Sequence, residues 1–193
     1  MSADGRLLLV ATPSPPMVRI FDSELKEIRI HPVVSRDGKT NSTVYAAYDA
    51  TARHSLVIVL RDLPEIWEVS YDPKAEPIYD GLVHDYRMGE ALATSGYLGI
   101  RRTILRHPLR DIFFDEHYRH VIGLSRRESD GKLHANVINL DIRRSIAEVD
   151  MPDSVSTEAG FAVNWNGGSV TAVHSPKTSY DNGKDILRRY CAP

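Results

Sequence analysis

The sequence predicts an all-β fold, because short apolar runs separated by turns recur along its 193 residues while helical periodicity is weak throughout. Apolar residues make up 42% of the chain and charged residues 26%, a composition that supports a packed core. A unit also repeats: an apolar strand, a second strand ending near an acidic residue, and a third strand of alternating character. Units of about four strands with a period near ~45 residues are typical of propeller blades, so we expect a partial β-propeller.

The first half of the chain holds two of these units. Runs rich in aliphatic, β-branched and aromatic residues predict strands at residues 5–12, 17–22, 25–32, 43–47, 54–60 and 65–71. The second strands of the two units end near Asp22 and Glu68.

The second half holds a third unit and a hairpin. Strands are predicted at residues 120–125, 133–140 and 146–150, with the second strand ending near Asp141. The strands at 161–164 and 169–174 flank Asn166-Gly167-Gly168, a turn sequence typical of a hairpin. Residues 90–94 are compatible with a single helical turn.

We therefore expect a propeller domain over residues 1–175, interrupted by a long loop insertion at about 72–111, and a divergent tail at 176–193. The insertion has few strand-like runs and concentrates Arg, His, Asp and Tyr. Long non-repetitive loops in a repeat scaffold often build functional sites. The alternative is a surface excursion that packs its own Tyr and Leu side chains.

Charge and cysteine content exclude several classes of protein. With 24 Lys and Arg against 26 Asp and Glu, the formal net charge is −2, which argues against non-specific nucleic-acid binding. The single cysteine, Cys191, cannot form an internal disulfide or a CxxC zinc site. We find no signal peptide and no apolar stretch long enough to span a membrane.

Common catalytic motifs do not occur. The sequence lacks GxGxxG, GxxxxGK[ST], GxSxG and HExxH, so nucleotide-binding, serine-hydrolase and zinc-protease functions have no support. His117 and His120 have a spacing that suits a metal pair on a helix, but their neighbours indicate a strand edge. We expect His31 to be a turn residue, and His54 and His134 to be structural residues of strands.

Four long strings carry a resemblance to a known family: LRDLPEIWEVSYDP, AEPIYDGLVHDYRMGE, RRTILRHPLRDIFFDEHYRHVIGLSR and VINLDIRRSIAEVDMP. They resemble the NirF family of haem d1 biosynthesis proteins, which is related to NirN and to the haem d1 domain of cytochrome cd1 nitrite reductase. The resemblance runs from about Ser2 to Pro152. It implies about four blades of an eight-bladed cytochrome cd1-type propeller.

The resemblance also implies a function. The expected ligand is haem d1 or an iron-tetrapyrrole precursor, modified by late oxidation of its side chains in the periplasm. Other haem d1 biosynthesis proteins or nitrite reductase are the expected partners. Exposed blade edges would additionally invite pairing with a second copy, so we expect a homodimer or aggregation.

The family motif directs attention to one histidine of the insertion. His84, in GLVHDY, is the expected axial ligand of the iron or an acid or base. The alternative is a histidine hydrogen-bonded within a loop. Tyr79 and Tyr86 flank His84 and are expected to contact the macrocycle face, with core packing as the rival interpretation.

Arginines of the same insertion are candidates for the carboxylates of the ligand. Arg87, Arg101 and Arg102 are expected to bind them in bidentate fashion, and the alternative is solvated charged residues. Asp111, in LRDIFF, is expected either to position a proton-transfer group or to cap a turn.

The chain also departs from the family. After Asp150-Met151-Pro152 the family has a segment like Gly-Met-Pro-His-Leu-Gly, whereas this sequence reads DSVSTEAGF and lacks that histidine. Blades expected before Met1 and after about Ser175 are missing, so activity of this chain by itself is an open expectation. The alternatives are an inactive propeller fragment that acts as an interaction module, and a relative of the nitrite reductase d1 domain.

Overall fold

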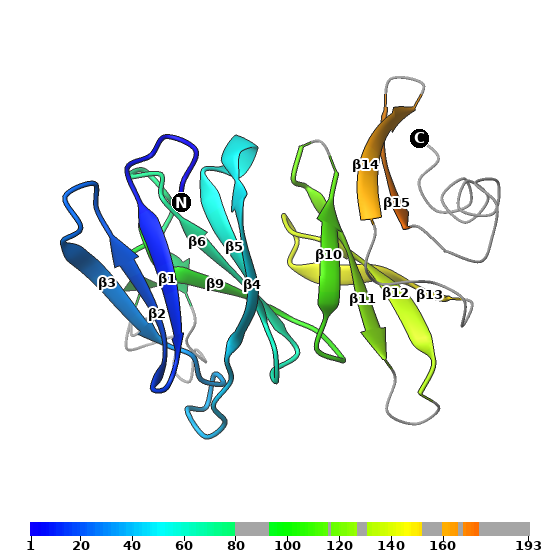
Figure 1. The fold of residues 1–193 in the computed structure, drawn as a ribbon, viewed down its shortest axis with the longest axis horizontal. Helices are drawn as coiled ribbons and strands as arrows, with labels where there is room; N and C mark the ends of the chain where they lie inside the picture. The colour runs from blue at the N-terminus through cyan, green and yellow to red at the C-terminus, as the bar shows by residue number, and fades with distance from the viewer. Residues whose placement is uncertain (80–92, 116, 127–130, 152–159, 166–167, 174–193) are drawn as a thin grey trace, which may run out of the picture. The chain divides into compact units, whose positions relative to one another are not determined.

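The structure, a computed structural model, describes residues 1–79, 93–115, 117–126, 131–151, 160–165 and 168–173, with backbone alone at 111, 160–165 and 168–173. Apart from one 3-10 turn at Thr51–Arg53, every regular element in these ranges is a β-strand (Figure 1), which confirms the all-β prediction. The chain divides into two compact units, Met1–Thr103 and Ile104–Pro193, which are described separately below.

Unit 1 begins with a three-stranded antiparallel sheet, and its strands are β1 (Leu8–Pro13), β2 (Pro16–Phe21) and β3 (Glu27–Pro32), in that order. Asp22 closes the turn between β2 and β3, because its Oδ1 accepts the amide hydrogens of Glu24 at 3.0 Å and Lys26 at 2.9 Å. Such local side-chain bonds favour turns over continued strand.

A four-stranded antiparallel sheet follows in the same unit. Its strands, in order across the sheet, are β4 (Val44–Ala50), β5 (Ser55–Leu60), β6 (Glu65–Ser70) and β9 (Ile100–Ile104). Every residue of β5 and β6 is buried, which explains the nearly continuous apolar run SLVIVL of β5. The two glutamates of β6, Glu65 and Glu68, are each paired with an arginine.

The core of unit 1 joins its two sheets. Val18 and Ile20 of β2 are fully buried, and they belong to one cluster with Ile58 of β5 and Trp67 of β6. Ile58 lies directly opposite Trp67 in the register. Each such side chain contributes roughly 1.5–3 kcal/mol when fully buried. Trp67 is therefore a packing residue of this core.

Unit 2 contains a second four-stranded antiparallel sheet and a hairpin. The sheet strands are β10 (Arg110–Phe114), β11 (His120–Arg126), β12 (Leu133–Asn139) and β13 (Arg144–Asp150), in that order. The hairpin strands are β14 (Gly160–Trp165) and β15 (Gly168–Val173), which pair with each other as predicted. Meanders of four antiparallel strands are the blades of β-propellers, in agreement with the expected fold class.

The predicted strands match the observed ones closely, with three differences in detail. His31 lies within β3 and not in a turn, and His54 ends the 3-10 turn with a left-handed backbone, just before β5. Glu68 lies inside β6, so the turn residue equivalent to Asp22 is Asp72, whose Oδ1 accepts the amide hydrogen of Lys74 at 2.9 Å. The sequence thus reveals the repeat, but in the second unit the acidic turn residue is Asp72 and not Glu68.

The segment predicted as a loop insertion at about 72–111 also contains strands. It includes β9, the start of β10, and a short ladder of β7 (Ile78–Tyr79) and β8 (Ala93–Thr94). Residues 93–94, expected in a helical turn, form β8. These strands escaped prediction because β7 and β8 have two residues each and β9 carries two consecutive arginines.

Candidate functional site

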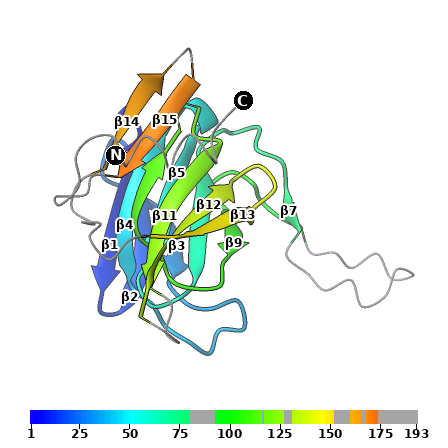
Figure 2. The ribbon, with the colours of Figure 1, turned by 90° about the vertical axis from the view of Figure 1, so that its right-hand side faces the viewer.

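The long connection between β6 and β9 is the distinctive feature of unit 1, and we call residues 71–99 the excursion. The equivalent connections in the other two sheets are short, at residues 22–26 and 140–143. Within the excursion Ile78 pairs with Thr94 and Tyr79 with Ala93. Figure 2 shows β7 lying away from the four-stranded sheet, so this ladder forms a stalk outside the blade.

The first part of the excursion, residues 71–79, is called its outgoing limb, and it starts at Tyr71, which makes two hydrogen bonds. The Tyr71 hydroxyl donates to Asp49 Oδ1 at 3.0 Å, and its amide donates to the His54 carbonyl at 2.8 Å. The rings of Tyr71 and His54 meet edge to face, with centroids 5.9 Å apart. Burial, reinforced by the Asp49 carboxylate, raises the pKa of Tyr71 to about 12, so this tyrosine is a neutral hydrogen-bond donor.

The two limbs touch backbone to backbone at a glycine. A Cβ atom on Gly96 would lie 2.0 Å from the Glu76 carbonyl oxygen and 2.5 Å from that of Ala75. A Cβ on Gly99 would lie 2.1 Å from the Ser95 carbonyl oxygen. Glycine is required at such close approaches because any larger residue would displace backbone atoms.

The last part of the excursion, residues 95–99, is called its return limb, and Leu98 attaches it to the rest of unit 1. Its amide donates to the Ser70 carbonyl at 2.8 Å, and its side chain is 2% exposed within the core of unit 1. Its carbonyl lies 2.8 Å from His31 Nε2. Since a carbonyl oxygen only accepts, His31 must carry its hydrogen on Nε2.

Arg101 and Arg102 follow the excursion on β9 and lie in different surroundings. Arg101 Nη2 donates to the Glu76 carbonyl of the outgoing limb. Arg102 Nη1 donates to Glu65 Oε2 at 2.8 Å and to the Val34 carbonyl at 2.9 Å. The Arg102 guanidinium also lies over the Trp67 ring, 4.6 Å from its centroid.

Arg102 therefore ties β9 to the neighbouring strand β6 and to the connection between β3 and β4. The side chain of Arg102 is 16% exposed and that of Glu65 is 6% exposed. The sequence left open whether Arg102 binds a ligand or is solvated, and in the structure it forms an ion pair with little access to solvent. A ligand carboxylate would have to displace Glu65 to reach Arg102. The sequence analysis did not single out Glu65. Its position two residues before Trp67 places both side chains on one face of the strand, and this pattern could have indicated a buried carboxylate.

The remaining predicted site residues have the following positions. His84, Tyr86 and Arg87 lie at residues 80–92, outside the described residues. Asp111 lies on the backbone of β10, where the register with β11 shifts between Arg110 and Ile112. Tyr79 is 67% exposed on β7, so core packing does not apply to it and its ring is open to a ligand.

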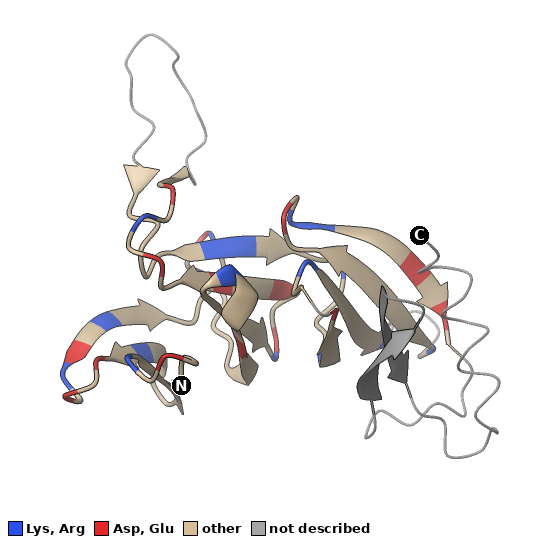
Figure 3. Ribbon diagram, turned by 90° about the horizontal axis from the view of Figure 1, so that it is seen from above, with Lys and Arg blue, Asp and Glu red and all other residues tan. Residues whose placement is uncertain are grey.

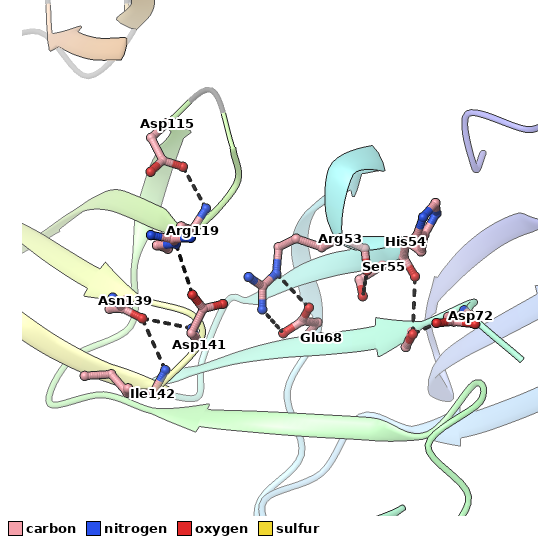
Figure 4. Close-up of polar contacts among 11 residues, drawn as sticks. Arg53, His54, Ser55, Glu68, Asp72, Asp115, Arg119, Asn139, Asp141 and Ile142 are labelled. Carbon is pink, nitrogen blue, oxygen red and sulfur yellow. Dashed lines mark hydrogen bonds and ion pairs between the residues drawn. The ribbon is translucent and has the colours of Figure 1, made fainter. Parts of the chain in front are cut away.

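A network of hydrogen bonds and ion pairs in unit 2 combines residue types that are common in active sites, but its contacts hold a loop in place (Figure 4). Asp115 Oδ1 accepts the Arg119 amide hydrogen at 2.7 Å, and Arg119 Nε lies 3.2 Å from Asp141 Oδ2. His120 Nδ1 lies 3.0 Å from Asp115 Oδ2, and Asn139 Nδ2 donates to His120 Nε2 at 3.1 Å. Both imidazole nitrogens are thus engaged in tying the β10–β11 loop to the end of β12.

Unit 1 has a separate buried ion pair, also drawn in Figure 4. Arg53 Nε donates to Glu68 Oε1 at 2.9 Å and Arg53 Nη2 donates to Oε2 at 3.3 Å. This bidentate geometry satisfies the Glu68 carboxylate, which lies on a buried strand. The pair fixes the 3-10 turn on β6.

The described residues were also compared with the requirements of a metal site and of a membrane span. Among them, no group of three or more His, Cys, Asp or Glu side chains could hold a metal ion. Basic and acidic residues are interspersed along the ribbon of the described residues (Figure 3). No helix with the length and apolarity of a membrane span occurs in the part of the chain that the structure describes.

Known proteins resemble this chain in sequence and in fold. The Cytochrome D1 heme domain family matches residues 1–80. Dihydro-heme d1 dehydrogenase of Pseudomonas aeruginosa is 29% identical over 166 residues, which are 86% of this chain and 28% of that protein. The β-propeller domain of the trilobed protease from Pyrococcus furiosus has 10% identity and a TM-score of 0.44, with coverage of 90% of this chain and 47% of that chain.

The solved structure of dihydro-heme d1 dehydrogenase NirN in complex with DHE is similar with a TM-score of 0.67 and 25% identity. The match covers 90% of this chain and 32% of that chain, so this chain spans about a third of the length of its relatives. Residues 1–80 thus match the model of the Cytochrome D1 heme domain family, and the chain is similar in sequence and in fold to dihydro-heme d1 dehydrogenase NirN.

Proposed function

We propose that this chain is a haem d1 biosynthesis protein of the NirF type, which binds an iron-tetrapyrrole precursor in the periplasm and takes part in the late oxidation of its side chains. The observation that carries the proposal is its 29% identity, over 86% of its length, to an enzyme named for dihydro-heme d1. The ligand-bound NirN structure supports a tetrapyrrole as the ligand class.

The residues proposed for this task belong to the excursion and its flanks. His84 would bind the iron as an axial ligand, and Arg87 and Arg101 would bind carboxylates of the macrocycle. Tyr79, with its exposed ring, and Tyr86 would contact the macrocycle face. When bound, the iron-tetrapyrrole supplies the redox chemistry.

Two further residues are assigned differently. Asp111 is proposed to position a proton-transfer group near the start of unit 2. We leave Arg102 out of the ligand set, because Glu65 and the Trp67 ring already hold its guanidinium.

Titration with a dihydro-haem d1 precursor, followed by visible absorption, tests the proposal. We expect a saturable spectral change for the unmodified chain and an affinity at least about ten-fold lower for His84→Ala, since an axial bond is lost. His117→Ala is the matched control, because this exposed histidine lies in unit 2 and should leave the affinity unchanged.

The outcomes separate the competing functions. A folded chain without any spectral change would contradict tetrapyrrole binding and favour an interaction module. Binding that His84→Ala leaves intact would contradict the role of His84.

The name of the relative favours a second candidate, a dehydrogenase of the NirN type. In that reaction two electrons and two protons leave a saturated side chain of the substrate, and an added electron acceptor must be reduced in equal amount. Conversion of bound dihydro-haem d1 with stoichiometric reduction of the acceptor would support the NirN type. Binding of dihydro-haem d1 without its conversion would contradict the NirN type.

A further inference from the structure

Leu98 has an unusual backbone conformation for its residue type. Its φ of 53° lies in the left-handed region, which is unfavourable for a bulky residue such as leucine. Three described contacts hold it there: the hydrogen bond from its amide to the Ser70 carbonyl, the burial of its side chain, and the hydrogen bond that its carbonyl accepts from His31. The return limb of the excursion therefore depends on each of these contacts.

His31 is the titratable member of this set. It lies on β3, half-buried, and the charged groups around it are Arg29 on its own strand and Arg102 on β9. Burial lowers the pKa of His31 below the ordinary value of 6.5; the Leu98 carbonyl raises it, and Arg29 and Arg102 lower it further. Glu65 on β6 is the nearby carboxylate, and it is already paired with Arg102.

We propose that His31 is a pH-responsive latch that holds the return limb of the excursion, residues 95–99, on the first sheet and releases it when the imidazole takes up a second proton.

The mechanism follows from the surroundings of the ring. A proton on Nδ1 would place a positive charge in a half-buried position beside two guanidinium groups, with no spare carboxylate among the named charges. The protonated ring is therefore more stable in water, and the Leu98 carbonyl loses its donor when the ring leaves. The remaining contacts of Leu98 then hold an unfavourable conformation alone.

The direction with pH follows from the lowered pKa. Because the closed state binds the second proton more weakly than the open state, the latch is fully closed above pH 6.5 and opens as pH falls below that value. The inference goes beyond the proposed function and does not depend on it, since each contact lies among described residues of unit 1 and involves no tetrapyrrole.

Amide hydrogen exchange on the ligand-free chain tests the latch. The readout is the protection factor of the Leu98 amide, measured against that of Ile58 on the central strand β5. Between about pH 7.5 and about pH 5.5 we expect the Leu98 protection of the unmodified chain to fall about ten-fold relative to Ile58. Equal behaviour of the two amides over this range would overturn the latch, since it would indicate a response of the whole unit.

Substitutions separate the donor role of His31 from its titration. His31→Gln keeps an N–H donor at the position of Nε2 and has no proton to gain, so Leu98 should stay protected at both pH values. His31→Ala should lower the protection at both, and His117→Gln should behave as the unmodified chain. If His31→Gln retained the wild-type pH response, the proposal would be wrong, and this comparison stands even if His31→Ala fails to fold.

Discussion

Arg101 and Arg102 are neighbours in the sequence, yet the alternation of a β-strand gives them different functions. Arg102 is held by Glu65, the Val34 carbonyl and the Trp67 ring, in a site with little solvent access. Arg101 lies in a solvent-accessible position with a single bond to the Glu76 carbonyl. Removing one partner of a buried ion pair is costly because the other charge stays buried without compensation.

Arg102→Ala should therefore destabilise the protein by roughly 3 kcal/mol, since it leaves the Glu65 carboxylate buried without its cation. Arg101→Ala should cost less than about 1 kcal/mol, as surface substitutions usually do. Urea unfolding followed by tryptophan fluorescence measures both, and Trp67 is a local reporter. Similar losses for the two variants would contradict the assignment of Arg102 to the core.

At the scale of elements, the excursion shows how a long segment is attached to a blade without disturbing it. Strands β5, β6 and β9 keep the blade order, and the limbs of the excursion meet in the β7–β8 ladder. Close backbone contact at Gly96 joins the limbs, while Tyr71 and Leu98 fix the two ends. The stalk is therefore a separate local structure built on the blade.

Gly96→Ala should disrupt this stalk, because the new Cβ would overlap the Glu76 carbonyl oxygen, 2.0 Å away. We expect a local loss of about 1–3 kcal/mol, the usual effect of forcing atoms into a packed site. Faster amide exchange in β7 and β8 with unchanged exchange in β5 is the expected result. Ser95→Ala, at the adjacent position, is the control, and an effect on β5 as large as on β8 would refute a separate stalk.

At the scale of the whole molecule, exposed strand edges are the feature with the clearest consequence. Within the described part of the chain β1 pairs with β2 alone, and no residue of β1 carries a charge. Val10 on this strand is 36% exposed. Uncharged open edges favour pairing with a strand of another molecule.

The chain should consequently self-associate, with an apparent mass that rises with concentration in light scattering. Val10→Lys should reduce that rise, because a lysine on an edge strand disfavours pairing. Lys74→Ala, on the excursion, serves as a control for a change in net charge at a distant position. A monomer at all concentrations for the unmodified chain would exclude association through β1.

The sequence alone determined the all-β class, the sheet strands outside the segment 72–114 and the hairpin of unit 2, because apolar alternation and Asn-Gly turns are local properties of the chain. It also located the excursion, and its resemblance to haem d1 proteins agrees with the similarity to dihydro-heme d1 dehydrogenase. His84, Tyr86 and Arg87 remain sequence-based assignments, since they lie outside the described residues.

The tertiary structure decided what depends on contacts between distant residues. Glu65 and Arg102 are far apart in the sequence and meet because β6 and β9 are neighbours in one sheet, whereas His31 and Leu98 meet because the excursion returns against β3 of the other sheet. No local pattern distinguishes Arg102, in the core, from Arg101, near solvent. Packing therefore decided that Arg102 is held by Glu65 and that the His31 ring meets the Leu98 carbonyl.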